Sequence, residues 1–273
     1  MKKVIVTGAF DSPGSRAIRF LEEASASGDV HVLLWSDEVA RSLEGKIPTF
    51  PQEERLYLLQ AIRYVRHVTL VTGPAEPDAI PRIHGLQPEV WAVDEASDNA
   101  RKEACCRFQG VDYRVVREAD LKGFPSPKFA SPQEQTSAKR VIVTGCYDWF
   151  HSGHVRFFEE VSRLGDLYVV VGHDANIRLL KGPRHPVFPQ DERRYMVQSV
   201  RHVKLALISS GDGWMDAEPE IPIIKPHIYA VNEDGHRPEK QAFCEARGIQ
   251  YVVMKRIPKE GLPARQSKDL RGF

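Results

Sequence analysis

The chain has 273 residues, with 38 Lys and Arg against 37 Asp and Glu and a formal net charge of +1 at pH 7. This length fits two domains of ordinary size, and the balanced charge argues against nucleic acid or an anionic membrane as the main partner. The apolar runs are of strand length and the first residues lack the features of a signal peptide, so we expect a soluble, cytoplasmic protein without a membrane span. The four cysteines form no CxxC pair and are expected to be reduced thiols.

The elements expected along the chain follow the same order in both halves. Each half begins with a buried strand, followed by a helix that carries FLEEA or FFEEV, a second strand, a helix that begins at a PQ-x-ER segment, a third strand and a further apolar segment. The strands are expected at 4–7, 30–35, 68–71 and 91–93, and at 141–144, 167–171, 203–208 and 229–231. Strands that alternate with helices indicate parallel βαβ units. The sequence therefore predicts an α/β fold of two tandem Rossmann-like domains, each an open, mostly parallel sheet flanked by helices.

Shared residues indicate that the two halves arose by duplication. The segment VIVTG at 4–8 recurs at 141–145, an offset of 137 residues, and Asp11 falls on Asp148 at the same offset. After one inserted residue the offset is 138, and FPQ at 50–52 recurs at 188–190. A period this long indicates a duplicated domain rather than a solenoid. We expect domains at residues 1–121 and 140–273, joined by a Pro-containing linker at 122–139.

The second half carries a motif directly after its first strand. The segment TGCYDWF at 144–150 leads into HSGH at 151–154, which opens a helix. Two histidines three residues apart therefore lie on the first helical turn, at the carboxyl end of a strand, where Rossmann-like sheets bind ligands. Gly153 removes a side chain between them, and the amide groups at a helix start attract anions. This arrangement suits a polyphosphate.

The pattern T-G-x-x-D-x-x-H-x-G-H resembles the signature of the cytidylyltransferase-like nucleotidyltransferases. Downstream, LKG at 180–182, ER at 192–193 and RHV at 201–203 resemble the lysine loop, ER motif and R-x-V of that family. The tandem arrangement is similar to that of the ethanolamine-phosphate cytidylyltransferases. The resemblance implies that a small phosphorylated acceptor attacks the α-phosphorus of CTP and that pyrophosphate leaves. It also implies a Mg²⁺ ion on the triphosphate, held partly by the substrate phosphates.

The resemblance further implies roles for individual residues. Catalysis would consist of aligning the two substrates and stabilising charge on the transferred phosphate, without a protein nucleophile. The expected catalytic residues are His151, His154 and Lys181. The expected nucleotide-binding residues are Thr144, Gly145, Cys146, Tyr147, Asp148, Gly153, Arg193 and Ser267. Arg201 and Arg256 are expected to bind the acceptor. None of the residues is expected to bind a metal directly.

Two departures from the family pattern stand out. The family closes with a G-[IV]-S-[ST]-[ST] loop, whereas this chain has GLPARQSKDL at 261–270, in which added side-chain donors substitute for hydroxyls. In the first half the residues aligned with the two histidines and with Lys181 are Gly14, Ala17 and Glu44. We therefore expect the first domain to lack transferase activity and to serve as a packing partner in an intramolecular pseudo-dimer. Two copies of the chain could also form a homodimer.

Several alternatives stay open at this stage. Lys181 could be an ordinary loop lysine, Arg193 and Arg201 could be solvated helix charges, and Asp148 could cap the HSGH helix. Ser267 could likewise cap the last helix. The donor could be ATP, which would make the protein an adenylyltransferase, or the protein could bind nucleotides as a regulatory module without catalysis. The acceptor could be a polyol, amino-alcohol or sugar phosphate.

Overall fold

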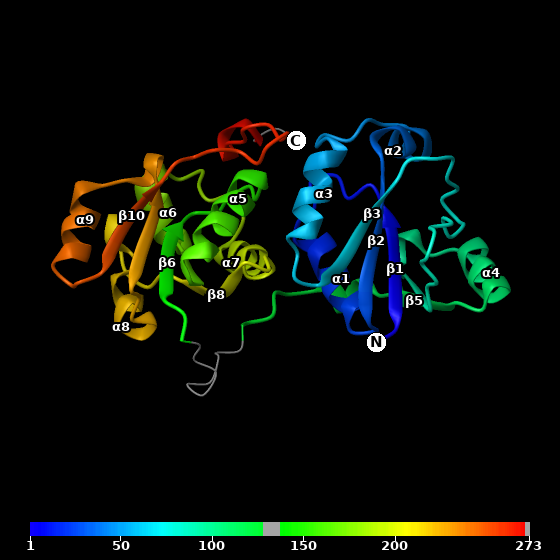
Figure 1. The fold of residues 1–273 in the computed structure, drawn as a ribbon, viewed down its shortest axis with the longest axis horizontal. Helices are drawn as coiled ribbons and strands as arrows, with labels where there is room; N and C mark the ends of the chain where they lie inside the picture. The colour runs from blue at the N-terminus through cyan, green and yellow to red at the C-terminus, as the bar shows by residue number, and fades with distance from the viewer. Residues whose placement is uncertain (128–136, 271–273) are drawn as a thin grey trace. The chain divides into compact units, whose positions relative to one another are not determined.

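The computed structural model describes residues 1–127 and 137–270, and the chain divides into two compact units, Met1–Gly123 and Phe124–Phe273 (Figure 1). Each unit is built on one five-stranded sheet in which every pair of neighbouring strands is parallel. The predicted α/β fold with two Rossmann-like sheets flanked by helices is therefore confirmed.

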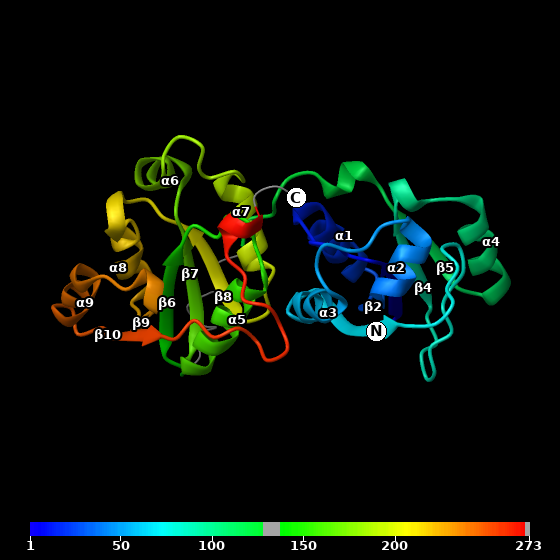
Figure 2. The same ribbon diagram turned by 90° about the horizontal axis from the view of Figure 1, so that it is seen from above.

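The sheet of the first unit has the strand order β3-β2-β1-β4-β5. Its strands are β1 (Lys3–Gly8), β2 (Asp29–Trp35), β3 (Val65–Val71), β4 (Val90–Asp94) and β5 (Asp112–Val116). Its helices are α1 (Ser15–Ser25), α2 (Asp37–Glu44), α3 (Gln52–Gln60) and α4 (Ala100–Gln109), and the 3₁₀ turns η1 (Glu95–Ser97) and η2 (Glu118–Leu121) follow β4 and β5. Because side chains alternate across a strand, Ile5 and Trp91 pack with Cys106 of α4, while α1 and α3 cover the other face (Figures 1 and 2).

The sheet of the second unit has the order β10-β9-β6-β7-β8, which repeats the topology of the first. Its strands are β6 (Arg140–Gly145), β7 (Asp166–Val171), β8 (Val203–Ile208), β9 (Ile228–Asn232) and β10 (Gln250–Met254). Its helices are α5 (Ser152–Val161), α6 (Asp174–Lys181), α7 (Gln190–Gln198), α8 (Ile221–Ile224) and α9 (Pro238–Glu245). The 3₁₀ turns include η5 (Gly213–Met215), η7 (Glu233–Gly235) and η8 (Ser267–Leu270).

The helices of the second unit cover both faces of its sheet. Ile142 and Tyr229 form one core cluster with Cys244 of α9 and Ile224 of α8. Helices α5 and α7 lie on the opposite face (Figures 1 and 2). The chain runs from β6 through β7 to β8 on one side and then returns to β9 and β10 on the other, so the strand order reverses between β6 and β9. This is the position at which open parallel sheets bind ligands.

Some elements differ from the sequence-based expectation. Strand β3 begins at Val65, three residues earlier than expected. The fifth strands β5 and β10 were not foreseen because they lie at the sheet edges, are only partly buried and lack the continuous apolar run of β4 and β9. Of the expected linker, Phe124 and Pro125 contact Arg194 of α7 through their carbonyl oxygens at 3.3 and 2.9 Å, and residues 128–136 lie outside the described residues. Across residues 1–127 and 137–270 no helix is long and apolar enough to cross a membrane. All four cysteines are free thiols, as expected.

Candidate active site

The HSGH helix begins immediately after a strained loop. Between β6 and α5 the backbone of Tyr147 and Trp149 has φ values of 54° and 52°, in the left-handed region that bulky residues seldom adopt. Phe10 and Ser12, at the equivalent positions of the first unit, have φ values of 49° and 45°. Strain of this kind persists where the surrounding structure enforces it, often beside a ligand site. The loop therefore has the same unusual path in both units.

His151 is the N-cap of α5 and is completely buried. Its Nδ1 accepts a hydrogen bond from the backbone N–H of Gly153 at 3.0 Å. Burial, followed by the charges of Arg256 and Arg265, lowers the pKa of His151 to about 3. The ring is therefore neutral near pH 7 and, because Nδ1 is an acceptor, carries its proton on Nε2. That Nε2 lies 3.5 Å from the hydroxyl oxygen of Ser267.

His154 stacks on His151, with 3.9 Å between the ring centroids and 24° between the ring planes. It also meets the edge of Tyr147, at 5.4 Å between centroids. Burial, assisted by the nearby His151 and by cationic Arg256 and Lys181, holds the pKa of His154 well below its usual value. Its Nδ1 is buried and has no hydrogen-bond partner among the described residues. A neutral imidazole with an unpaired polar atom is typical of a site that acts on a ligand.

Gly153 is required by the close packing of this helix start. A Cβ at this position would lie 2.9 Å from Cε1 of His151 and 3.4 Å from the carbonyl oxygen of Arg265. The first distance is shorter than real Cβ contacts, so any larger residue would displace the His151 ring. The spacing of the HSGH motif thus has a direct steric reason.

The histidine pair borders a cavity of about 470 Å³ at the carboxyl ends of β6 and β9, a size typical of small-molecule sites. It is lined by ten of the residues expected from the sequence, namely Thr144, Gly145, Cys146, Tyr147, Asp148, Gly153, His154, Lys181, Arg256 and Ser267. His151 lies against His154 and is not itself among the lining residues. The structure therefore gathers most of the expected residues around one cavity.

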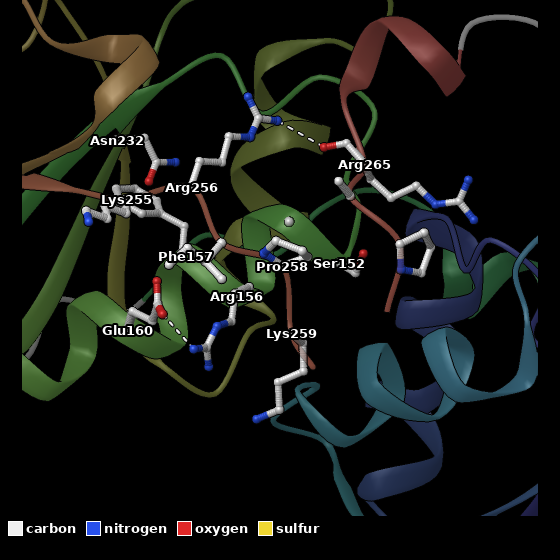
Figure 3. A pocket seen from close by; sticks show the side chains of 14 residues that line it. Ser152, Arg156, Phe157, Glu160, Asn232, Lys255, Arg256, Pro258, Lys259 and Arg265 are labelled. Atoms are coloured by element: carbon white, nitrogen blue, oxygen red, sulfur yellow. Dashed lines mark hydrogen bonds and ion pairs between the residues drawn. The ribbon is translucent and has the colours of Figure 1, made fainter. Parts of the chain in front are cut away.

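Two of the cationic side chains expected at the cavity come from different segments. Lys181 is the last residue of α6, rather than a loop residue, and its side chain is exposed. Arg256 follows β10 and forms an ion pair with Asp234. It also donates a hydrogen bond to the carbonyl oxygen of Arg265 at 3.0 Å (Figure 3). Arg256 thus ties the segment after β10 to the closing loop that carries Ser267.

Asp148 and Arg193 hold the loops around the cavity together. The carboxylate of Asp148 accepts hydrogen bonds from the backbone N–H groups of Val187 and Phe188 at 2.9 and 3.0 Å. It therefore fixes the loop before α7, whereas the cap of α5 is His151. Arg193 is 1% exposed and donates to the carbonyl oxygens of Phe188, Cys146 and Gly172 at 2.8, 2.6 and 2.8 Å. It also pairs with Asp174 at 2.7 Å.

The same loop supports exist in the first unit. Asp11 accepts from the N–H groups of Thr49 and Phe50 at 2.8 and 2.9 Å. Arg55 is fully buried, donates to the carbonyl oxygens of Phe50 and Trp35 at 2.9 Å each, donates to that of Ala9, and pairs with Asp37 at 2.6 Å. Since these contacts occur with and without the histidines, they support the fold of both units rather than one reaction.

Besides His151, two of the expected residues lie outside the cavity lining. Arg193 lies behind it, in the position just described, and Arg201 is exposed in the turn that precedes β8. Sequence reasoning also missed lining residues. These are chiefly Asn176, Trp214, Asp216 and Lys240. The one available signal was the recurrence of a lysine, because Lys240 aligns with Lys102 at the offset of 138 residues.

A second, much smaller cavity of about 30 Å³ lies between α5 and the segment 255–265 (Figure 3). Arg156 on its wall pairs with Glu160 at 2.6 Å, and Lys259 pairs with Glu159 at 3.1 Å. This volume is suited to a water molecule rather than a substrate. The larger cavity is therefore the candidate active site.

Comparison with known proteins agrees with this placement. The family model described as "Cytidylyltransferase-like" matches residues 142–271, which contain the histidine pair and the cavity. The FAD synthase of Ferroglobus placidus is 34% identical over 125 residues, which cover 45% of this chain and 78% of that protein. The FAD synthase of Archaeoglobus profundus is 38% identical over 124 residues, 44% of this chain and 76% of that protein.

A further relative is the bifunctional protein HldE of Nitratiruptor sp., which is 33% identical over 127 residues. The match covers 44% of this chain but only 27% of HldE. Together with a parallel sheet that reverses its strand order beside a buried histidine pair, these matches show that the chain belongs to the cytidylyltransferase-like family of nucleotidyltransferase enzymes.

Proposed function

We propose that the second unit transfers a nucleotidyl group from a nucleoside triphosphate to a small phosphorylated acceptor and releases pyrophosphate. The observation that carries this proposal is the neutral pair of His151 and His154, stacked at the start of α5 beside a cavity that also contains Lys181 and Arg256. In this reaction an acceptor phosphate oxygen bonds to the α-phosphorus while the bond to the β-phosphate oxygen breaks. Such a step needs alignment and charge stabilisation rather than a protein nucleophile.

The residues would divide this work by their position. His154 would donate a hydrogen bond to the α-phosphate, where negative charge develops in the transition state, and the positive end of the α5 dipole would favour the phosphate there. Lys181 and Arg256 would neutralise the remaining phosphate oxygens from either side, and Ser267 would hold the triphosphate from the closing loop. His151, buried beneath His154, would orient the second ring. Arg193 would act as a positioning residue through the loops that it joins.

The relatives favour ATP over the expected CTP as the donor. Two of them are named FAD synthase, and FAD is a molecule that contains an adenylyl group. We therefore propose adenylyl transfer as the leading form of the reaction and keep cytidylyl transfer as the second candidate, because the family model carries that name. The acceptor in either case is a phosphate monoester.

The expected Mg²⁺ would arrive with the triphosphate. No group of three or more His, Cys, Asp or Glu side chains that could hold a metal is found in residues 1–127 and 137–270. Of the carboxylates in the cavity, that of Asp148 is bonded to two backbone amides and that of Asp234 pairs with Arg256. The carboxylate of Asp216 accepts a hydrogen bond from the Ser209 hydroxyl at 2.9 Å. A Mg²⁺ ion held mainly by substrate phosphates and water fits such a site.

We also propose that the two units arose by duplication and that only the second is active. The equal strand orders, the shared left-handed loop residues and the matched arginines support a common origin. In the first unit Arg16 stands where Gly153 stands in the second, and its guanidinium pairs with Asp94 at 2.8 Å and with Glu118 at 2.7 Å. The first unit therefore has a salt-bridged arginine at the start of α1, where the second unit has a glycine between two histidines. The packing role expected for the first unit stays a prediction.

The proposal is tested by pyrophosphate release. The full chain is incubated with ATP or CTP, Mg²⁺ and a set of acceptors that includes flavin mononucleotide and sugar, polyol and amino-alcohol phosphates. We expect acceptor-dependent pyrophosphate release with one triphosphate, reduced by at least about 100-fold in His154→Ala, the scale seen when a donor to the transition state is removed. Triphosphate binding without pyrophosphate release for any acceptor would instead indicate the regulatory module considered above.

A further inference from the structure

Lys240, on the first turn of α9, is a buried cation in the wall of the active-site cavity. It is 8% exposed, and its Nζ lies 3.3 Å from the hydroxyl oxygen of Thr144 and 5.7 Å from the centre of the Tyr229 ring. Among the described residues no carboxylate contacts this ammonium group directly. Burial lowers the pKa of Lys240, and the charge of the Asp216 carboxylate on the same cavity wall opposes that shift from a longer distance. Burying an ammonium group without a carboxylate in direct contact is costly, so a retained lysine of this kind calls for a role.

The first unit provides an internal comparison. Its equivalent residue, Lys102, is also 8% exposed, and its Nζ lies 5.9 Å from the centre of the Trp91 ring. However, Lys102 donates a short hydrogen bond of 2.6 Å to the backbone carbonyl oxygen of Ser97. In the second unit Gly235 stands at the position of Ser97, and Lys240 turns instead to Thr144 at the edge of the cavity. The buried lysine thus donates a hydrogen bond to a backbone carbonyl oxygen in the unit that lacks the histidines, and to a side-chain hydroxyl in the unit that has them.

Arg237 and Trp214 line the same cavity as Lys240. Arg237, the N-cap of α9, lies one turn earlier on the same side, and its guanidinium lies 4.5 Å from the centre of the Trp214 ring. Trp214 is 54% exposed although it lines the cavity, so part of its ring is available for contact. An aromatic face beside two hydrogen-bond donors is complementary to a planar ring that bears carbonyl oxygens or ring nitrogens.

We propose that Lys240, Arg237 and Trp214 bind the planar heteroaromatic ring of a substrate, with Lys240 donating to a carbonyl oxygen or ring nitrogen. The inference rests on the proposed function, which puts the phosphates of the same substrates at α5. Helix α9 reaches the cavity from the face of the sheet opposite to α5, so the ring and the phosphates are held from different sides. The ring belongs either to the nucleobase of the donor or to an aromatic acceptor.

The test compares Lys240→Met with its matched control Lys102→Met in the full chain. Calorimetric titrations use four probes in the presence of Mg²⁺, namely ATP, CTP, flavin mononucleotide and the ring-free inorganic triphosphate. We expect Lys240→Met to weaken binding of at least one ring-bearing probe by tenfold or more, because it removes a charged hydrogen-bond donor. Inorganic triphosphate should bind as it does to the wild type. Lys102→Met should bind all four probes unchanged.

The pattern of loss identifies the ring. Weaker binding of ATP or CTP alone assigns the subsite to the nucleobase, and weaker binding of flavin mononucleotide alone assigns it to the acceptor. Thermal unfolding verifies that Lys240→Met is folded, and Lys240→Gln replaces it if it is not.

Two results would overturn the subsite: ring-bearing probes that bind the folded variant as tightly as the wild type, or an equal loss for inorganic triphosphate. In both cases intact pyrophosphate release would leave the proposed function standing. A wild type that binds the probes but never releases pyrophosphate would refute that function instead.

Discussion

Arg193 is the residue for which sequence pattern and structure suggest different roles, so its replacement is informative. Arg193→Met keeps most of the aliphatic volume but removes the guanidinium, which is 1% exposed. The change leaves the carbonyl oxygens of Phe188, Cys146 and Gly172 without this donor and the Asp174 carboxylate without its partner. The substitution therefore breaks one buried ion pair and three charge-assisted hydrogen bonds at once.

The expected loss of stability is large. Removing one partner of a buried ion pair costs about 3–5 kcal/mol, a substantial part of the roughly 5–15 kcal/mol that stabilises a typical protein. For a unit of this size each kcal/mol shifts Tm by about 2–4 °C, so Arg193→Met should lower the Tm of the second unit by roughly 6–20 °C. Scanning calorimetry measures this change directly.

Arg55→Met is the matched control, because Arg55 makes the equivalent contacts in the first unit. It should lower stability by a similar amount while nucleotide affinity, measured well below Tm, stays at the wild-type value. The reasoning would be refuted by an Arg193→Met variant that unfolds within about 2 °C of the wild type yet binds nucleotide tenfold more weakly. That result would make Arg193 a direct nucleotide contact.

Three further outcomes are expected. Burial lowers the pKa of His151 to about 3 in the folded chain, whereas a histidine in the unfolded chain has its usual pKa near 6.5. Between these two values only the unfolded chain binds the proton. The stability that is present above pH 6.5 is therefore lost as the pH falls toward 3. His151→Asn keeps an N-cap acceptor but cannot bind this proton. Its free energy of unfolding, measured in urea titrations, should therefore fall by about 1 kcal/mol less than that of the wild type between pH 7 and pH 5.5. An equal fall in both proteins would contradict a neutral His151. Gly153→Ala should lower kcat/KM by about 100-fold, because the added Cβ displaces the His151 ring. The control Gly73→Ala should keep the wild-type kcat/KM, because its added Cβ meets no atom within 4 Å. Equal kcat/KM values for the two variants would contradict the steric explanation of the motif. Calorimetry should give one nucleotide per chain, and a stoichiometry of two would show that the first unit also binds.

Much of the fold follows from local pattern. Apolar strands that alternate with amphipathic helices predict parallel sheets, and the repeated VIVTG and PQ-x-ER segments locate equivalent elements in both halves. The histidine pair was also predictable, since its position after a strand and at a helix start depends on neighbouring residues alone. These features need no knowledge of which distant segments meet.

The remaining features depend on long-range contacts. Arg193 binds carbonyl oxygens 47 and 21 residues away, and nothing in its own helix distinguishes a buried clamp from a ligand contact. Lys240 reaches Thr144 across 96 residues, so its place in the cavity appears only when β9 lies beside β6. The fifth strands β5 and β10 lie at the sheet edges, where partly exposed and polar residues hide the apolar run that marks β4 and β9.

The central claim is that the α-phosphate group, rather than the γ-phosphate, is transferred. The most direct measurement incubates the full chain with Mg²⁺, an accepted phosphorylated substrate and ATP or CTP labelled at the α-phosphorus, in parallel with triphosphate labelled at the γ-phosphorus. We expect the α-label to appear in the product and the γ-label to appear in pyrophosphate, with both signals strongly reduced in His154→Ala. Release of the γ-label as orthophosphate, or its transfer to the acceptor, would contradict nucleotidyl transfer at this site.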